Sequence, residues 1–239
     1  MTLLLKYVNN FNGKTILDVG CGGGSLVYNL INNGYDCYGV DVEFKSEKHT
    51  EELIEKGVLI KIGNNRSDRL NFKEEEYIWR VSDNNFDLVV SHAVIEHVKN
   101  IEKFTKQNYR VCADGGYVIH YFPSKFSFIE PHTGIPFGGI LRVKSYYWLA
   151  TKIGLCFNNY KNKPDEALSY MENFTFYRNL STIKSEFQKS GFIYVKNDIK
   201  FIFNYSRLPY LNYIPVVNKL FSIFRSNLLV FKKPTNTKL

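Results

Sequence analysis

A glycine-rich loop between a short apolar run and an amphipathic segment constrains this chain more than any other feature of its sequence. Residues 15–20 read Thr-Ile-Leu-Asp-Val-Gly, which is a β-prone run, and residues 26–31 carry four apolar side chains at helical spacing. The pattern predicts a strand, a tight loop and a helix. Glycines let the backbone turn sharply there and approach a ligand, and the first turn of the helix offers unpaired N–H groups.

The segment beyond this helix completes a βαβ unit that ends in an acid. Asn33-Gly34 predicts the end of the helix, and residues 37–41 predict a second strand. Asp41 follows Gly20 by 21 residues, close to the spacing of the acid that binds ribose in nucleotide-binding units. The unit therefore predicts a cofactor of nucleotide type.

The rest of the chain continues the α/β alternation. Residues 58–62 and residues 77–81 compete for the third strand, and the sequence does not decide between them. Residues 86–91 predict a buried parallel strand, residues 101–112 a helix and residues 117–121 another strand. A helix from about Leu180 to Gly191 and strands at 192–195 and 227–231 complete a single domain over residues 1–239.

Two segments depart from this alternation. Residues 123–171 are rich in aromatic residues and contain a Gly138-Gly139 pair, so we expect an insertion or lid over the site. Residues 196–239 hold eight Lys and Arg against Asp198 alone, with apolar residues at helical spacing between Val216 and Phe224. Such a helix either lies on an anionic membrane surface or covers the last two strands.

Charge, hydropathy and cysteine content indicate the kind of partner, the cellular location and the state of the thiols. The net charge of +8 comes from residues 121–239, where 17 Lys and Arg face 6 Asp and Glu. This half suits an anionic partner or forms a solvated basic surface. We expect a cytoplasmic location, with membrane association as the variant, because no apolar stretch approaches about 18 residues and no signal peptide is visible. The four cysteines are far apart and form no CxxC pair, so we predict free thiols and no metal site.

The glycine loop distinguishes between two kinds of cofactor. A dinucleotide loop of the GxGxxG type would place glycine where this chain has Ser25, and it has no use for Asp18, two residues before the first glycine. Here the sequence resembles the class I S-adenosylmethionine-dependent methyltransferases, whose first motif is an acid followed by GxGxG, matched by Asp18, Gly20, Gly22 and Gly24. Segments 83–98 and 109–116 extend the resemblance, which covers residues 14–121.

This resemblance implies a Rossmann-like, doubly wound α/β fold with a seven-stranded, mostly parallel sheet, and S-adenosylmethionine as cofactor. Asp41 would accept hydrogen bonds from both ribose hydroxyls, and the loop would line the methionine end. The adenine contacts, which fall between residues 57 and 80, stay unassigned. The residues expected to bind the cofactor are Asp18, Gly20, Cys21, Gly22, Asp41, Val42 and Ser91.

Histidines are the main candidates for chemistry on the methyl acceptor, because a hydroxyl acceptor must lose a proton. His92 and His120 fall near the carboxyl ends of predicted strands, where open α/β sheets bind ligands. Residues 120–132 are also similar to a segment of bacterial methyltransferases of surface-glycan biosynthesis, which implies that Glu130 and His132 face the acceptor. The alternative for this pair is a hydrogen bond that stabilises a loop. We predict His132, Glu130 and His120 as catalytic and interpret His97 as a packed residue.

The expected reaction moves a methyl group from S-adenosylmethionine to an oxygen, with nitrogen as the second choice, of a small molecule or a glycan or lipid-linked precursor. One alternative is a nucleic-acid methyltransferase. The chain lacks the Asn/Asp-Pro-Pro-aromatic signature of base methylation, so no nucleic-acid partner is expected. Another alternative is a scaffold subunit that binds the cofactor without catalysis.

Overall fold

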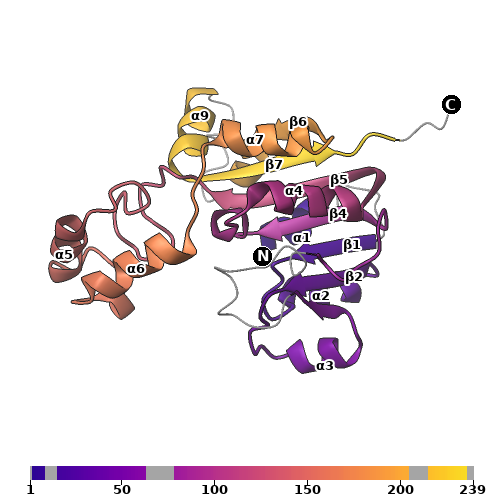
Figure 1. Ribbon diagram of the computed structural model, residues 1–239, viewed down its shortest axis with the longest axis horizontal. Helices are drawn as coiled ribbons and strands as arrows, with labels where there is room; N and C mark the ends of the chain where they lie inside the picture. Colours follow the sequence, from indigo (N-terminus) through magenta and orange to yellow (C-terminus); the bar gives the residue numbers. More distant parts are fainter. Residues whose placement is uncertain (1, 9–14, 63–77, 205–214, 236–239) are drawn as a thin grey trace.

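One seven-stranded sheet organises the chain (Figure 1). The structure is a computed structural model that describes residues 2–8, 15–62, 78–204 and 215–235. The strand order is β3-β2-β1-β4-β5-β7-β6, and β7 alone runs antiparallel to its neighbours β5 and β6. The strands are β1 (Thr15–Val19), β2 (Asp36–Asp41), β3 (Leu59–Lys61), β4 (Phe86–His92), β5 (Cys112–Pro123), β6 (Ile193–Asn197) and β7 (Ser226–Lys232). The predicted mostly parallel, doubly wound sheet is confirmed.

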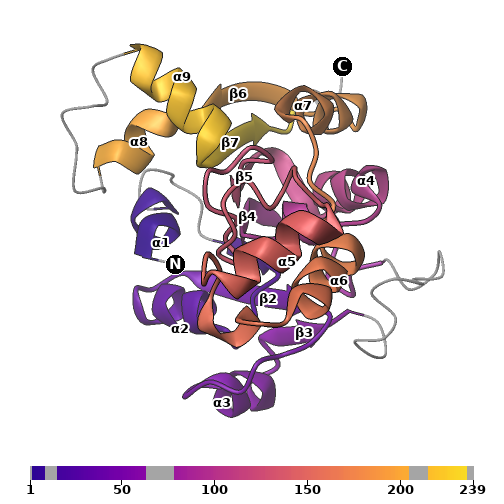
Figure 2. The same cartoon turned by 90° about the vertical axis from the view of Figure 1, so that its left-hand side faces the viewer.

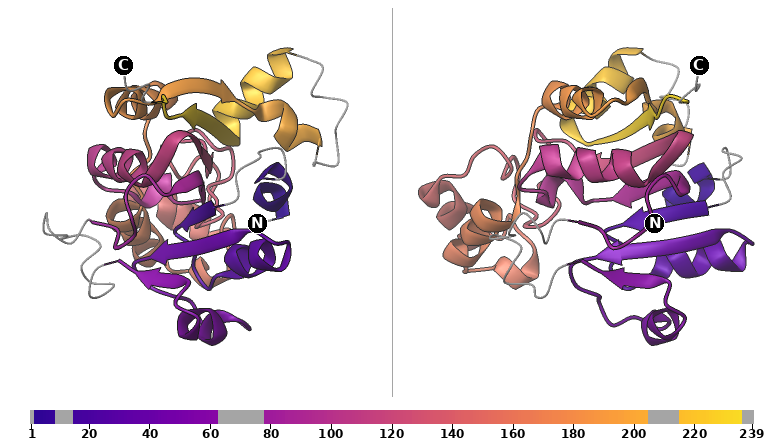
Figure 3. Two further views of the ribbon diagram at one scale, coloured as in Figure 1. Left: turned by 90° about the vertical axis from the view of Figure 1, so that its right-hand side faces the viewer. Right: turned by 45° about the vertical axis from the view of Figure 1, so that its right-hand side comes forward.

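Helices cover both faces of this sheet, as Figure 3 shows from two sides. Successive residues of a strand point to opposite faces, so Leu88 and Val89 of β4 enter different apolar cores. The core on one face receives α1, α2 and α8, and the core on the other receives α4 and α7. The helices that flank the sheet are α1 (Thr2–Val8), α2 (Ser25–Asn32), α3 (Thr50–Glu55), α4 (Ile101–Val111), α7 (Leu180–Lys189), α8 (Ile199–Asn204) and α9 (Pro215–Phe224).

The third strand is the first of the two sequence candidates. β3 pairs in parallel with β2 over Leu59–Lys61, whereas residues 78–81 form no strand. Trp79 from the rejected candidate is nonetheless buried, at 3% exposure, and packs edge-on against Phe104 of α4. Its apolar character therefore reflects packing outside the sheet. Tyr77 and residues 63–76 lie outside the described residues.

Residues 124–179, called here the inserted segment, connect β5 to α7 and project from the carboxyl ends of the parallel strands (Figures 1 and 2). They contain α5 (Lys144–Lys152), the 3-10 turn η4 (Asn158–Tyr160) and α6 (Pro164–Phe174). Ile135, Tyr147 and Met171 are fully buried in a small apolar core of its own. Because α6 continues to Phe174, the segment extends beyond the end at residue 171 that the sequence indicated.

The C-terminal helix α9 has two apolar faces. Val217 and Phe221 are partly buried against the core that also holds α8. Val216, Leu220 and Phe224 are exposed. The helix therefore covers part of the domain, as one of the two sequence interpretations expected, and also presents apolar side chains to solvent. Within the described ranges, no helix is both long and apolar enough to cross a membrane.

Candidate cofactor and acceptor site

The glycine loop after β1 is joined to the acid at the end of β2. Gly20 donates its N–H to the Val40 carbonyl at 2.7 Å, and Gly22 donates to Asp41 Oδ2 at 2.8 Å. Both glycines have positive φ angles, of 73° and 60°. A Cβ at Gly20 would collide with Val94. The loop thus needs glycine for its backbone conformation and for close approach to its neighbours.

A pocket of about 1120 Å³ opens at the carboxyl ends of β1, β2 and β4. Gly20, Gly22, Asp41 and Val42 line it, as predicted for a cofactor site. Apolar surface from Ile62 and Trp79 continues this end of the pocket. The sequence did not assign the adenine contacts. Ile62 and Trp79 are apolar side chains near the end of β3 that line this part of the pocket.

Three residues predicted to bind the cofactor are absent from the pocket lining. Asp18 is buried behind the loop, with 4% exposure, and burial together with the charge of Asp41 raises its pKa to about 8. Cys21 points into the apolar core with α2, and the Ser91 hydroxyl is fully buried. For Asp18 and Ser91 this follows from strand alternation, because Val19 and His92, their neighbours along β1 and β4, line the pocket. The part of Asp18, Cys21 and Ser91 in binding the cofactor stays a prediction.

His120 also differs from its predicted role. Its ring is fully buried between Phe104 and Phe187, and its Nδ1 lies 2.6 Å from Ser91 Oγ. Burial lowers the pKa of His120 to about 3. β5 extends three residues beyond His120, so the ring sits within the sheet instead of at its edge. His120 is therefore a core histidine without access to an acceptor.

His132 and His97 lie together at the other end of the same pocket. His97 belongs to η3 (Ile95–His97), the 3-10 turn that follows β4, and His132 belongs to the inserted segment. Their Nε2 atoms are 3.0 Å apart. His92 and Tyr170 also line the pocket. His132 thus lines the pocket, and its contact with an acceptor stays a prediction. His97 lines the pocket as well, which its interpretation as a packed residue missed.

Glu130 supports His132 and is itself enclosed. It has 1% exposure, and Oε1 accepts a hydrogen bond from His132 Nδ1 at 2.7 Å and one from Tyr177 at 2.9 Å. Oε2 accepts from the backbone and the hydroxyl of Thr133. Burial opposes its ionisation, but these hydrogen bonds outweigh burial and hold the pKa of Glu130 below its usual value. Glu130 is therefore an ionised positioning residue outside the pocket lining, and its predicted contact with the acceptor is corrected.

Glu96 was not predicted and adjoins the two histidines. It precedes His97 in η3, has 2% exposure, and burial raises its pKa to about 8. A signal was present in the sequence, since Glu96 and His97 come directly after the carboxyl end of a buried strand. The four cysteines, Cys21, Cys37, Cys112 and Cys156, are free thiols, as predicted.

Comparison with known proteins agrees with this geometry. A family model described as a methyltransferase domain matches residues 1–197. Norajmaline N-methyltransferase of Rauvolfia serpentina is 32% identical over 108 residues, which are 44% of this chain and 35% of that protein. A ubiquinone biosynthesis O-methyltransferase of Rickettsia bellii is 29% identical over 99 residues, covering 41% of this chain and 38% of the relative. The matches thus span little more than a third of these curated relatives.

Solved structures show the same fold. An S-adenosylmethionine-dependent methyltransferase from Mesorhizobium loti superimposes with a TM-score of 0.54 at 15% identity, over 92% of this chain and 90% of that one. Phosphoethanolamine N-methyltransferase 2 of Haemonchus contortus, in complex with S-adenosyl-L-methionine, gives 0.54 at 17% identity, over 97% of this chain and 52% of that one. The fold is that of the class I S-adenosylmethionine-dependent methyltransferases. The chain belongs to the methyltransferase domain family, which confirms the predicted class and its cofactor.

Proposed function

We propose that the chain transfers the methyl group of S-adenosylmethionine to an oxygen of a small molecule, or of a glycan or lipid-linked precursor. One observation carries the proposal: a single pocket joins the Gly22–Asp41 pair at one end to His97 and His132 at the other. A cofactor held at the first end can direct its methyl group toward an acceptor held at the second. Such alignment is the main contribution of a protein to an in-line displacement.

The cofactor end offers complementary groups. The Asp41 carboxylate would accept hydrogen bonds from the ribose hydroxyls of the cofactor. Ile62 and Trp79 would provide apolar surface for the adenine, and the loop at Gly20 and Gly22 would border the methionine part. On transfer, the acceptor oxygen bonds to the methyl carbon while the carbon–sulfur bond breaks. The acceptor's proton passes to an imidazole at the other end of the pocket, His97 or His132, and the sulfonium becomes a neutral thioether.

The acceptor end favours oxygen over nitrogen. A hydroxyl is a weak nucleophile until its proton is removed, whereas a neutral amine needs little assistance. Imidazoles at this end, His97 and His132, suit an acceptor that must be deprotonated. The names of the relatives cover both O- and N-methyltransferases, so the assignment to oxygen rests on this chain's own side chains.

A transfer assay tests the proposal. Methyl-labelled S-adenosylmethionine is incubated with the protein and one of three probes: a catechol, a nucleotide sugar or phosphoethanolamine. We expect label on a hydroxyl-bearing probe, with formation of S-adenosylhomocysteine, and loss of transfer in Asp41→Ala. Label on phosphoethanolamine alone would contradict the assignment to oxygen. Nucleic acid is not proposed as a partner, and salt-sensitive retention of RNA or DNA in a filter-binding assay would contradict that.

A second proposal concerns the membrane surface. The exposed apolar residues Val216, Leu220 and Phe224 of α9 lie at helical spacing beside the exposed cations Lys219 and Arg225. Apolar side chains with flanking cations suit an anionic bilayer surface, which would also hold a lipid-linked acceptor near the protein.

Vesicle flotation tests this surface of α9. We expect the protein to float with phosphatidylglycerol vesicles, and Leu220→Asp to stop it. Leu155→Asp is the matched control, since Leu155 is as exposed but belongs to the inserted segment. Absence of flotation in the unmodified protein would overturn the membrane proposal and leave the methyltransferase proposal intact.

A further inference from the structure

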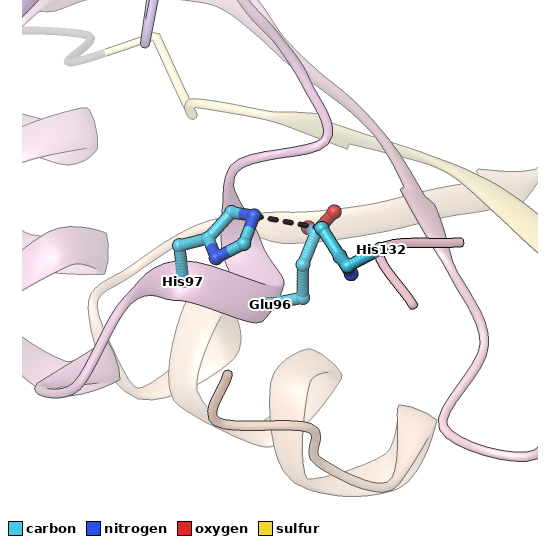
Figure 4. Close-up of side chains that lie close together, drawn as sticks. All are labelled: Glu96, His97 and His132. Atoms are coloured by element: carbon cyan, nitrogen blue, oxygen red, sulfur yellow. Dashed lines mark hydrogen bonds between the residues drawn. The ribbon is translucent and has the colours of Figure 1, made fainter. Parts of the chain in front are cut away.

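Three side chains at the acceptor end of the pocket have the composition of a metal site. Glu96 and His97 come from η3 and His132 from the inserted segment, and their nearest ligand atoms all lie within 4.8 Å of one another (Figure 4). Ligand atoms about 2.1 Å from a single ion lie at most about 4.2 Å apart, so the three groups would have to draw slightly closer to share one ion. The Nε2 atoms of the two histidines are 3.0 Å apart, which fits neighbouring positions in one coordination shell.

The hydrogen bonds behind the histidines leave both Nε2 atoms as ligands. His97 Nδ1 lies 2.7 Å from the carbonyl of Phe174, and His132 Nδ1 lies 2.7 Å from the carboxylate of Glu130. A carbonyl and a carboxylate only accept, so each Nδ1 donates in these two contacts and each Nε2 is the ring nitrogen that faces the other histidine. Metal-binding histidines are oriented in this manner by a carbonyl or carboxylate behind the ring.

The two Nε2 atoms face each other beside a buried carboxyl group, that of Glu96. Glu96 has 2% exposure, and neither of its oxygens has a hydrogen-bond partner among the residues that the structure describes. Buried polar groups are normally paired, and a carboxylate without a donor is costly. A divalent cation among the three groups satisfies the carboxylate and both imidazoles together.

We propose that Glu96, His97 and His132 bind one divalent transition-metal ion. Two imidazoles and one carboxylate suit Zn²⁺, Mn²⁺ or Fe²⁺, whereas Mg²⁺ and Ca²⁺ prefer shells of oxygen. Three protein ligands leave coordination positions open, and His97 and His132 both border the pocket. The site extends the chain's chemistry beyond that of a protein that only aligns cofactor and acceptor.

A role for the ion in transfer rests on the proposed function. An acceptor hydroxyl bound at an open position would lose its proton more readily, because a cation stabilises the oxyanion. With the ion bound, His97 and His132 hold the metal and do not take the proton themselves. The proton would pass to solvent, and the oxygen would attack the methyl carbon while the carbon–sulfur bond breaks. Glu130 is a positioning residue in this arrangement, since it acts through His132.

Calorimetric titration of the full chain, stripped with a chelator, tests the site. We expect one equivalent of Zn²⁺ or Mn²⁺ per chain and much weaker binding of Mg²⁺. Glu96→Gln and His132→Asn should each lower the affinity by about 10-fold or more. His49→Gln is the matched control: His49 is also a histidine beside a glutamate, with Nδ1 3.6 Å from Glu52, but it lies outside the pocket lining. The metal affinity of the His49→Gln variant should equal that of the unmodified protein.

Titration of the same proteins with S-adenosylhomocysteine separates the two proposals and reports on folding. If the homocysteine ligand binds and neither Zn²⁺ nor Mn²⁺ does, the two imidazoles share only a proton and the metal proposal is overturned. Unchanged metal affinity in both site variants would overturn it as well. Metal binding without binding of S-adenosylhomocysteine would support the ion site and contradict the proposed function.

Discussion

Gly20 must be glycine for two reasons, its backbone conformation and the close packing around it. Its φ of 73° is strained for any other residue, and an added Cβ would meet Val94. Gly34 has a similar φ of 86°, but nothing lies within 4 Å of an added Cβ there. Comparing the same substitution at Gly20 and at Gly34 therefore separates the free-energy cost of a left-handed backbone from the cost of a steric collision.

We predict that Gly34→Ala lowers the free energy of unfolding by about 1–2 kcal/mol, the cost of a left-handed backbone for a residue with a Cβ. Gly20→Ala should cost more than this and should also abolish binding of S-adenosylhomocysteine. Urea unfolding and calorimetry measure both quantities. Equal destabilisation by the two substitutions, with binding retained in both, would show that the loop does not need a close approach at Gly20.

Asp18 should make the free energy of unfolding depend on pH. Burial and the charge of Asp41 raise its pKa from the usual 3.8 to about 8 in the folded chain. Between these values the folded chain holds a proton that the unfolded chain has released. The free energy of unfolding therefore falls as the pH rises from about 4 to 8.

We predict that Asp18→Asn removes this part of the pH dependence. As the pH rises from 4 to 8, the free energy of unfolding of the variant should increase by at least about 1.4 kcal/mol relative to that of the unmodified protein, the equivalent of one pKa unit. Urea unfolding at the two pH values, without ligand, measures the difference. An identical pH dependence in both proteins would show that Asp18 is already ionised below pH 4 in the folded chain.

At the scale of elements, Arg142 holds the inserted segment together. Its guanidinium donates to the carbonyls of Met171 and Thr175 and to the Thr175 hydroxyl, joining the chain before α5 to the end of α6. It also lies over the ring of Tyr177, which in turn donates to Glu130. The position of His132 thus depends on contacts between the chain before α5 and the chain at and after the end of α6.

We predict that Arg142→Met lowers the stability of the inserted segment by about 2–3 kcal/mol, because charged hydrogen bonds are lost and buried acceptors remain. Lys144→Met is the control, since Lys144 and Asp165 form an ion pair whose side chains are 76% and 74% exposed. Such pairs contribute about 0–1 kcal/mol. Thermolysin should cleave residues 124–179 faster in the first variant only. Equal cleavage rates would show that Arg142 does not hold the segment.

Sequence and structure agree best where the signals are local. Gly20, Gly22 and Asp41 belong to one βαβ unit, so the strand, loop and helix patterns together predict that these residues meet. The buried positions of Ser91 and His120 could not be predicted, because a shift of one residue along a strand reverses the face of a side chain. The third strand also stayed open, since both candidates are apolar for different reasons.

At the scale of the whole molecule, the acceptor end joins segments distant in the sequence. His97 follows β4, His132 and Tyr170 come from the inserted segment, and Tyr177 precedes α7. No local pattern places these residues together, and only the return of the inserted segment to the carboxyl edge of the sheet does so (Figure 2).

Calorimetric titration with S-adenosylhomocysteine and with NAD tests the central claim most directly. We predict one site for S-adenosylhomocysteine and none for NAD. Asp41→Ala should weaken binding by about 10-fold or more, because charged hydrogen bonds contribute about 1.5–3 kcal/mol. Asp36→Ala, at the exposed start of the same strand, should bind as the unmodified protein does. Binding of NAD in place of S-adenosylhomocysteine, or equal affinity in Asp41→Ala, would contradict the account.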